Sequence, residues 1–533
     1  MPLKNAFIII FLIINTIASA TDYYISSSGN DSNNGLSSSK PWKTIAKVNA
    51  SYFLPGDTIF FNKGDTWRET LIIPSSGTSA NYITFGAYGI GNAPKILGSS
   101  LVTAWTNRSG NVWKSIANFT NPALIPDYGN IYFKETSGSI TWGRVEKATT
   151  WRNCVTEYDW YWHGDTIYIY SPTNPNNRYS GVEVSQRQTC VNLDSKTYLT
   201  FDGIEIAYAG EFGIISLPYN SLTNISGLIV KNCDIHHFGS KRGFGGLALS
   251  LWYSDMLIQN NTIHDASRRN ISLNLDANVI QAHDIIIENN TMYDAYHTSG
   301  VDINTTDAGT WDNIIIRKNL IYQNTLAVDT AENPVVNLMF LAVQGTFTGS
   351  VTNVYVYNNI LKNNSLSAIT IEHVNSVFIY NNTFYGFSTG ISDQGLTMIN
   401  VSGVGTSIIK NNIFYDNMPS TTSPYTRCFN IISGPTVTMD YNLYYVPDAS
   451  QIIGCWHTTY YPLSAWATYK STSSQDANSP TPANPLFTST TDLSLQAGSP
   501  AINAGVVITG MPQSDFLGNP IVGLRDIGAY EKQ

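Results

Sequence analysis

The chain has 533 residues, with 29 Lys and Arg against 38 Asp and Glu, and its formal net charge is −9. Because 43% of its residues are hydrophobic, it can bury a core, which excludes the intrinsically disordered class. The acidic balance disfavours a nucleic-acid partner, since contacts to phosphate require clustered Lys and Arg.

The first twenty residues have the features of a secretory signal peptide. Lys4 supplies the positive charge, residues 7–14 form an unbroken apolar run, and Ala18-Ser19-Ala20 is a small-residue cleavage site. No later stretch is apolar enough to span a bilayer. We therefore predict a protein that begins near Thr21 after cleavage and is secreted to the periplasm or the extracellular space, with no membrane span.

Export places the five cysteines in a compartment that permits disulfides. Cys428 and Cys455 are 27 residues apart, close to the repeat length described below, and form one expected pair. Cys154 and Cys190 form a second expected pair, and Cys233 is expected to be a buried free thiol. No Cys/His cluster has the spacing of a zinc site, so no structural metal of that kind is predicted.

Residues 100–185 form a segment rich in Trp and Tyr, with short β patterns separated by polar turns. The stretch YDWYWHGDTIYIYSP (158–172) is typical of antiparallel strands joined by a tight turn. We predict a small inserted β module. Trp151, Trp160 and Trp162 are expected mainly in the core of this module, and a sugar-stacking wall is the alternative.

A short phrase that recurs about every 29 residues organises residues 186–483. It consists of a β-branched run, two polar residues that are usually Asn-Asn, and an apolar residue, as in LIQNNTI (257–263), IIENNTM (286–292) and IKNNIF (409–414). Most copies are 28 to 30 residues apart, with one gap of 40 and one of 23. Self-similarity at such a period predicts a solenoid. The Asn pairs are expected to stack at a turn and bond along the stack.

Each unit carries a second short β pattern, as in NISLNLD (270–276), SGVDIN (299–304) and SAITIE (367–372). Strands this short are not stable alone, but stacked coils pair each strand with its copy one coil away, about 4.8 Å off. The core is therefore predicted to be a stack of parallel sheets.

The chain resembles the secreted right-handed parallel β-helix proteins of the pectate-lyase-like superfamily. The resemblance rests on the opening YYISSSGNDSNNGLSSSKPWKTIAKVN (23–49), the Asn-pair coils, and the close NPLFTSTTDLSLQAGSPAINAG (484–505) with DIGAYE (526–531). It implies an all-β fold with an N-terminal cap and first coils over 21–99 and a C-terminal capping segment over 484–533. The superfamily includes lyases, glycosidases, esterases and inert surface proteins, so the resemblance alone does not choose a reaction.

Residue alternation predicts which side chains leave the core. The outward residues form one row of Ser272, Asp302, Asn337 and Thr370 and a second row of Asn274, Asn304 and Glu372. Asp302 and Glu372 are two coils apart and one row offset, which separates their Cα atoms by about 12 Å. Inverting glycosidases place two carboxyl groups about 6.5–9.5 Å apart, so this pair is the candidate acid and base. The alternative is a pair of ordinary surface carboxylates.

Cationic and aromatic residues gather in the coils beside Asp302. His297 is a candidate acid or base, while Lys241, Arg268 and Arg269 suit a substrate carboxylate or sulfate. Trp252 and Tyr296 are candidates for sugar stacking, and Asn274, Asn304 and Asn337 for binding substrate. His236 and His264 occupy the position of Tyr293 in a later coil, so we expect them to form a turn ladder.

Three functions fit these features. The first is a secreted glycoside hydrolase that uses Asp302, Glu372 and His297 on a polysaccharide. The second is a polysaccharide lyase acting on uronate by β-elimination, with Lys241, Arg268 and Arg269 among its groups. The third is a non-catalytic protein that either binds carbohydrate or serves as a surface β-helix protein. No cofactor is predicted, Ca²⁺ on Asp/Asn-rich loops is an open alternative, and a monomer is expected.

Overall fold

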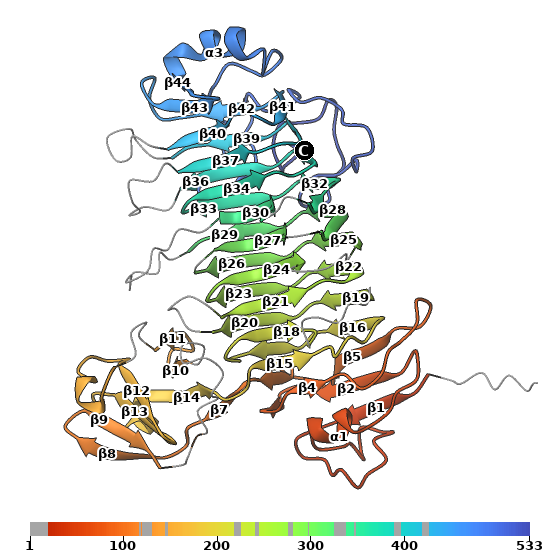
Figure 1. Cartoon of the computed structure of the whole chain (residues 1–533), viewed down its shortest axis with the longest axis vertical. Coiled ribbons are helices and arrows are strands. Elements are labelled where there is room, and N and C mark those ends of the chain that lie inside the picture. The colour runs from red at the N-terminus through yellow and green to blue at the C-terminus, as the bar shows by residue number, and fades with distance from the viewer. Residues whose placement is uncertain are drawn as a thin grey trace, which may run out of the picture.

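The computed structural model describes residues 20–116, 119, 130–143, 148–217, 225–239, 245–275, 281–296, 298–306, 308–324, 337–345, 348–387, 396–417 and 426–533. These residues form an elongated stack of coils that runs from the N-terminal strands at one end to α3 at the other (Figure 1). A small group of strands projects beside the N-terminal end.

Three long sheets line the stack, and their strands pair in parallel with the copy one coil away. Sheet A contains β1 (Asp22–Ile25), β2 (Thr58–Asn62), β5 (Ile83–Tyr88), β16 (Leu199–Asp202), β19 (Ser226–Lys231), β22 (Ser254–Gln259), β25 (Gln281–Glu288), β28 (Thr310–Arg317), β31 (Ser350–Val351), β32 (Val354–Tyr357), β35 (Ser376–Tyr380), β38 (Thr406–Lys410) and β41 (Thr436–Asp440). Sheet B contains β3 (Thr66–Trp67), β6 (Lys95–Leu97), β17 (Glu205–Ala207), β20 (Asp234–Phe238), β23 (Thr262–Ala266), β26 (Thr291–Ala295), β29 (Leu320–Tyr322), β33 (Ile360–Asn364), β36 (Thr383–Phe387), β39 (Ile413–Tyr415) and β42 (Leu443–Tyr445).

Sheet C is the sheet on which the predicted outward rows lie. It contains β4 (Leu71–Ile72), β15 (Thr189–Asn192), β18 (Phe212–Ile215), β21 (Leu247–Leu251), β24 (Arg269–Leu275), β27 (Ser299–Thr305), β30 (Asn337–Val343), β34 (Ser367–Glu372), β37 (Thr397–Ser402), β40 (Arg427–Ile431), β43 (Ile452–Trp456) and β44 (Thr459–Pro462). Within the described part of sheet C, only the last pair, β43 with β44, is antiparallel. The prediction of an all-β fold built as a parallel β-helix is confirmed.

The second Asn of each repeated pair forms a buried ladder at the turn between sheets A and B. The ladder contains Asn261, Asn290, Asn319, Asn359, Asn382, Asn412 and Asn442. Asn290 shows the pattern: its Oδ1 accepts the backbone N–H of Asn261 at 2.9 Å, and its Nδ2 donates to the carbonyl of Ile258 at 2.9 Å. The first Asn of the pair, Asn289, turns the chain with a φ of 55°. An amide that both donates and accepts along the stack explains why Asn recurs there.

Aliphatic ladders fill the interior between the three sheets. Val301 and Ile303 of β27 point inward and are fully buried, and they pair with Ile271 and Leu273 of the preceding coil. The same core cluster continues from Ile25 to Tyr469, so one core supports the whole stack.

Both ends of the stack are covered by short helices or loops. At the N-terminal end lies α1 (Ile45–Asn49), whose N-cap Thr44 accepts the backbone N–H of Lys47. At the other end lie the 3₁₀ helix η2 (Leu463–Ala465) and α3 (Trp466–Ser473). The C-terminal chain then folds back along the stack, where Phe487 packs on Tyr385 and Tyr415.

Antiparallel strands occupy residues 99–185, inserted between β6 and β15. They are β7 (Ser99–Leu101), β8 (Trp105–Ser109), β9 (Val112–Ser115), β10 (Ile131–Glu135), β11 (Ile140–Trp142), β12 (Trp160–His163), β13 (Thr166–Tyr170) and β14 (Tyr179–Ser185), with η1 (Trp151–Asn153) and α2 (Pro175–Arg178) between them. Trp160 and Trp162 are buried in this module's core, as expected. Trp151 instead is half-buried, and the guanidinium groups of Arg108 and Arg152 both pack against its ring.

All five cysteines are free and buried, so neither expected disulfide is present, while Cys233 matches its prediction. In the register of β40 with β43, Cys455 lies opposite Asn430, two residues beyond Cys428. That slip separates the two cysteines by about 6.6 Å along the strand in addition to the distance between coils, which is too far for a disulfide. Cys154 lies in the module, whereas Cys190 is in β15 with its thiol directed at the carbonyl of Ala207.

Candidate functional site

The outer face of sheet C carries two rows of side chains, with one residue from each coil. The first row contains Ser250, Ser272, Asp302, Phe340, Thr370 and Asn400. The second row contains Asn274, Asn304, Ala342, Glu372 and Ser402. The rows therefore place Asp302 and Glu372 two coils apart and two residues offset, in the register that the sequence predicts.

Strand β30 has a register that alternation did not predict. Asn337 was expected in the outward row beside Asp302, and the same alternation would place Met339 outward as well. Met339 is instead fully buried in the core. Phe340 instead takes the place beside Asp302 and is half-buried. Asn337 lies at the start of the strand and accepts a hydrogen bond from the Thr370 hydroxyl at 2.9 Å. The run NLMFLAV is apolar at almost every position, so its sequence does not define an inward and an outward side.

Asp302 leaves the core on the outer side of sheet C, but it is only 1% exposed, so the expectation that it is open to solvent was wrong. Its Oδ2 lies 3.0 Å from Nε of Arg269, which comes from the preceding coil, and accepts the Ser299 hydroxyl at 3.1 Å. Its Oδ1 accepts Nδ2 of Asn304 at 2.5 Å. Both oxygens are therefore held in place by neighbours, a constraint that alternation cannot reveal.

The two carboxyl groups of this face both have raised pKa values. Burial raises the pKa of Asp302 above its ordinary value, and the charge of Arg269 and the hydrogen bonds to the carboxylate offset this only in part. Burial also raises the pKa of Glu372, while the nearby His373 acts in the opposite direction. Carboxyl groups that retain a proton above the usual range are typical of acid–base sites.

Glu372 lines an open hollow of about 400 Å³ on the same face of the stack. The other lining residues are Val343, Gln344, Gly345, His373 and Ser402. The register places the Cα atoms of Asp302 and Glu372 about 12 Å apart. Their carboxyl groups approach the range of an inverting pair, about 6.5–9.5 Å, only if the side chains lean toward each other.

Three polar atoms near Asp302 are buried but have no hydrogen-bond partner within the described chain: Oδ1 of Asn304, Oδ1 of Asn274 and Nε of Arg268. Asn304 and Asn274 face each other on adjacent coils, so their oxygens lie about one coil spacing apart. Buried polar groups are rarely left unpaired in folded proteins. Two carbonyl acceptors and one guanidinium donor near Asp302 are thus left without a partner among the described residues.

The remaining expected site residues are placed differently. Trp252 belongs to the central core and is 6% exposed, while Tyr296 is 7% exposed and donates its hydroxyl to Asp265 at 2.5 Å. Neither ring therefore provides the open stacking face that was expected. His297 and Lys241 lie outside the described residues.

A cluster of histidines and carboxylates lies on sheet B, close to its turn into sheet C. The rings of His236 and His264 stack with centroids 4.9 Å apart, and His264 stacks on Tyr293 at 4.5 Å, which confirms the predicted ladder. His264 also directs Nδ1 to Oδ2 of Asp265 at 2.7 Å and Nε2 to Oδ1 of Asp234 at 3.3 Å. Burial opposes protonation, but these two carboxylates outweigh it and raise the pKa of His264 to about 9.

Neighbouring groups connect this cluster to the inserted module and to the preceding coil. Trp142 of β11 stacks on His237 with centroids 5.4 Å apart. Glu205 pairs with Lys95 and lies 3.5 Å from Nε2 of His236. Burial opposes ionisation of Glu205, but His236 and Lys95 lower its pKa to about 2. In the sequence, DIHH (234–237) and TIHDA (262–266) place an aspartate close to each ladder histidine. The sequence does not show what these aspartates contact, because the contacts are made between adjacent coils.

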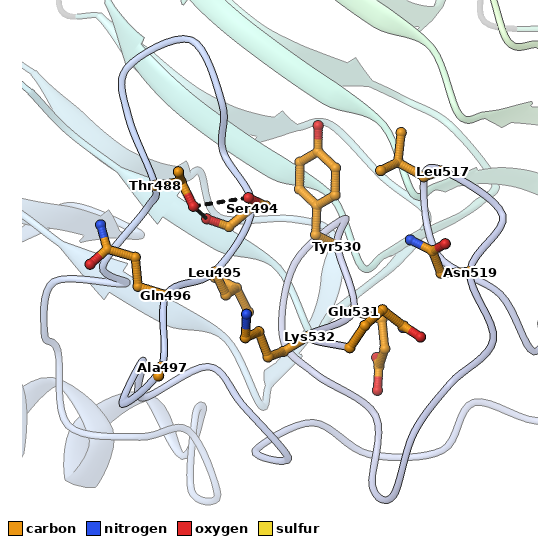
Figure 2. A pocket seen from close by; sticks show the side chains of 11 residues that line it. Thr488, Ser494, Leu495, Gln496, Ala497, Leu517, Asn519, Tyr530, Glu531 and Lys532 are labelled. Carbon is orange, nitrogen blue, oxygen red and sulfur yellow. Dashed lines mark hydrogen bonds between the residues drawn. The ribbon is translucent and has the colours of Figure 1, made fainter.

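A second hollow, of about 380 Å³, lies within the C-terminal segment (Figure 2). Tyr530, Leu517 and Thr488 are among its lining residues, and none of the predicted site residues lines it. Its carboxylate, Glu531, accepts the backbone N–H groups of Val522 and Asp526. That acid therefore organises the capping segment.

Comparison with known proteins identifies the class of fold. The family model described as "Right handed beta helix region" matches residues 165–340. Among solved structures, XylC in complex with xylose is 14% identical and has a TM-score of 0.57. The match covers 96% of this chain and 98% of the XylC chain. The chain is a right-handed parallel β-helix protein, and at this identity the structural likeness shows the fold alone.

Two further similarities involve lacto-N-biosidases. The curated enzyme of Bifidobacterium longum subsp. longum is 39% identical over 79 residues, which is 14% of this chain and only 5% of that enzyme. A structure of the GH136 lacto-N-biosidase from Eubacterium ramulus is 14% identical and has a TM-score of 0.39, and the match covers 82% of this chain and 68% of that chain.

None of the helices in the described chain is both long enough and apolar enough to cross a membrane.

Proposed function

We propose that this protein is a secreted glycoside hydrolase that cleaves a polysaccharide lying along the outer face of sheet C. The observation that carries the proposal is the pair of carboxyl groups, Asp302 and Glu372, on one face of one sheet and both with raised pKa values. Hydrolysis of a glycosidic bond requires two such groups, one of which must bring a proton.

Asp302 suits the role of proton donor. Its burial favours the protonated form, while Arg269, Ser299 and Asn304 fix the position of its two oxygens. Substrate would displace part of this contact network, because the carboxyl group is closed to solvent in the free protein. A proton delivered to the glycosidic oxygen leaves a carboxylate beside Arg269, whose charge then stabilises it.

Glu372 suits the role of base that activates water, because its carboxyl group borders the open hollow. A sugar between the two acids would lie over Phe340 and Ala342, which occupy the intervening coil. The half-buried Phe340 ring offers an apolar surface for the sugar face, and the unpaired oxygens of Asn274 and Asn304 accept its hydroxyls. Acceptor oxygens favour hydroxyl donors over a substrate carboxylate.

The relatives add support for a glycan substrate. A lacto-N-biosidase shares a segment of 79 residues with this chain, and the similar XylC structure contains xylose. We propose that residues 1–20 direct export and that the protein acts as a monomer. We also propose that hydrolysis needs no cofactor and that His297 and Lys241 help to bind the substrate.

A lyase acting on uronate is the second candidate, because the buried Nε of Arg268 is unpaired within the described chain and suits a substrate carboxylate. Arg269 weakens this candidate. Its guanidinium contacts Asp302, Thr298 and Ser272, so its charge is already committed inside the protein.

The test combines two assays on the secreted chain. Neutral and uronate-containing polysaccharides are incubated with the protein, and products are followed both as reducing ends and as the ultraviolet absorbance of unsaturated sugars. We expect reducing ends without that absorbance, and an unsaturated product would establish the lyase instead. Absence of both products across the panel would refute the proposal.

Variants then test the carboxyl pair. Asp302→Asn and Glu372→Gln should each reduce kcat by about 10²–10⁴-fold, the usual contribution of a positioned acid or base. Glu211→Gln is the matched control, because Glu211 is also a carboxyl group with a pKa raised by burial and precedes β18 of the same sheet. Full activity in Glu372→Gln would remove Glu372 from the site.

A further inference from the structure

Two residues on one strand and a third on the next strand converge on the outer face of sheet B. Asp234 and His236 are two residues apart on β20, so both side chains point to the same side. His264 of β23 pairs directly with His236 one coil away. One ligand-type atom from each of the three side chains lies within 4.8 Å of those from the other two.

The contact between Asp234 and His264 is longer than a typical hydrogen bond between charged groups, which measures about 2.7–2.9 Å. Oδ1 of Asp234 is 3.3 Å from Nε2 of His264, and this buried oxygen has no hydrogen-bond partner among the described residues. Two ligands of a tetrahedral ion with bonds of about 2.0–2.1 Å lie about 3.3 Å apart. The spacing therefore suits two atoms that share a cation.

A second layer of contacts orients both histidine rings. Nδ1 of His264 lies 2.7 Å from Oδ2 of Asp265, and Nε2 of the same ring points at Oδ1 of Asp234. A metal ion bound on the Nε2 side would replace the proton that the ring carries there. Tyr296 donates to the other oxygen of Asp265 and fixes the carboxylate. Nδ1 of His236 is engaged with His237 at 2.8 Å. A carboxylate behind a histidine is the usual support of a metal ligand.

We propose that Asp234, His236 and His264 bind one divalent transition-metal ion, with Zn²⁺ as the ion best matched to two imidazoles and one carboxylate. A set dominated by nitrogen disfavours Ca²⁺ and Mg²⁺, which require oxygen ligands. The Asp234 side chain is 46% exposed and provides the entry route. A water molecule would complete the four-coordinate shell.

This site is separate from the proposed hydrolytic pair, which lies on sheet C. Binding would cross-link β20 and β23 next to the point where Trp142 of the inserted module stacks on His237. The ion would therefore hold adjacent coils together at the base of the module. A second triad, His237, His264 and Asp265, uses the Nδ1 side of the same imidazole. We assign the ion to the Nε2 side because Nδ1 is already bonded to Asp265.

The test is isothermal titration of the chelator-treated, full secreted chain with ZnCl₂ and, separately, with CaCl₂. We expect one Zn²⁺ per chain and no comparable Ca²⁺ binding. Asp234→Asn and His264→Gln should each weaken Zn²⁺ binding by at least about 10-fold, and Asp265→Asn by about 10–100-fold through the loss of ligand support. Circular dichroism confirms that each variant is folded, and X-ray absorption of the zinc complex should show nitrogen and oxygen ligands that include two imidazoles.

The matched control is His283→Gln, which alters the exposed group Asp255, His283 and Asp284 elsewhere on the stack. This variant should bind Zn²⁺ as the parent does. Loss of binding in His283→Gln with retention in His264→Gln would overturn the assignment. Absence of Zn²⁺ binding, or binding of Ca²⁺ alone, would overturn it as well. The Asp234→Asn variant distinguishes the two sides of the His264 ring, because Asp234 lies on the Nε2 side. Unchanged Zn²⁺ affinity in this variant would refute a site at Nε2.

Discussion

The Asn ladder allows a quantitative prediction about how one residue supports neighbouring coils. Replacing Asn290 with Ala removes four hydrogen bonds in which its side chain takes part: two accepted from Asn261, one donated to Ile258 and one donated to Asn319. The backbone N–H of Asn261 loses its acceptor, Oδ1 of Asn290, and remains buried without it. The side chain of Asn261 keeps its bond to Val230.

The magnitude follows from these contacts. An orphaned buried donor costs about 1–3 kcal/mol, and each further bond contributes about 0.5–1.5 kcal/mol. With partial relaxation of the neighbours, we expect Asn290→Ala to lower the local free energy of unfolding by about 3–5 kcal/mol. Asn289→Gly is the matched control in the same turn, because Asn289 is exposed and has a φ of 55°, which Gly adopts without strain.

Hydrogen exchange measured by mass spectrometry checks this prediction, because a solenoid loses protection mainly near the altered coil. Peptides covering residues 254–295 should exchange faster in Asn290→Ala, while peptides around residues 406–415 should change much less. The control should match the parent throughout. If Asn290→Ala also exchanged like the parent, the ladder would not be a stabilising element and the reasoning would fail.

Two further predictions concern ionisation and redox state. Since the pKa of Asp302 is raised in the folded protein, stability from its protonated form is present at low pH and is lost as pH rises through that pKa. The stability of Asp302→Asn relative to the parent should therefore increase from acidic to neutral pH in urea titrations, and the opposite trend would contradict the raised pKa. The chain unfolded in guanidinium without reductant should titrate five thiols, because all five cysteines are free, and a lower number would indicate a disulfide.

The sequence predicts the fold where its patterns repeat. Alternation in SGVDIN correctly directs Val301 and Ile303 inward, and alignment of the copies correctly relates Asp302 to Glu372. The recurring Asn pair predicts an amide stack because Asn can both donate and accept along it. These features depend only on the repeat length and on the pairing of each strand with its copy in the next coil. They can therefore be predicted without knowing any contact between distant parts of the chain.

The sequence does not predict features that depend on register or on contacts between coils. The spacing of 27 residues suggested that Cys428 and Cys455 stack, but β40 and β43 pair with a two-residue slip. The apolar strand β30 lacks alternation, so Phe340 could not be placed on the outer face. The burial of Asp302 depends on Arg269 from the preceding coil, and a single-strand pattern carries no information about that cover.

The architecture separates stabilising residues from those that are free to carry chemistry. Inward aliphatic residues and the Asn ladder serve the stack in every coil, so a change there affects neighbouring coils. Outward positions carry no such constraint, which is why the same ladder position holds His264 in one coil and Tyr293 in the next. Chemistry can therefore arise where a few adjacent coils place unlike groups side by side. Asp302 with Arg269 on sheet C, and Asp234 with His264 on sheet B, are two such places.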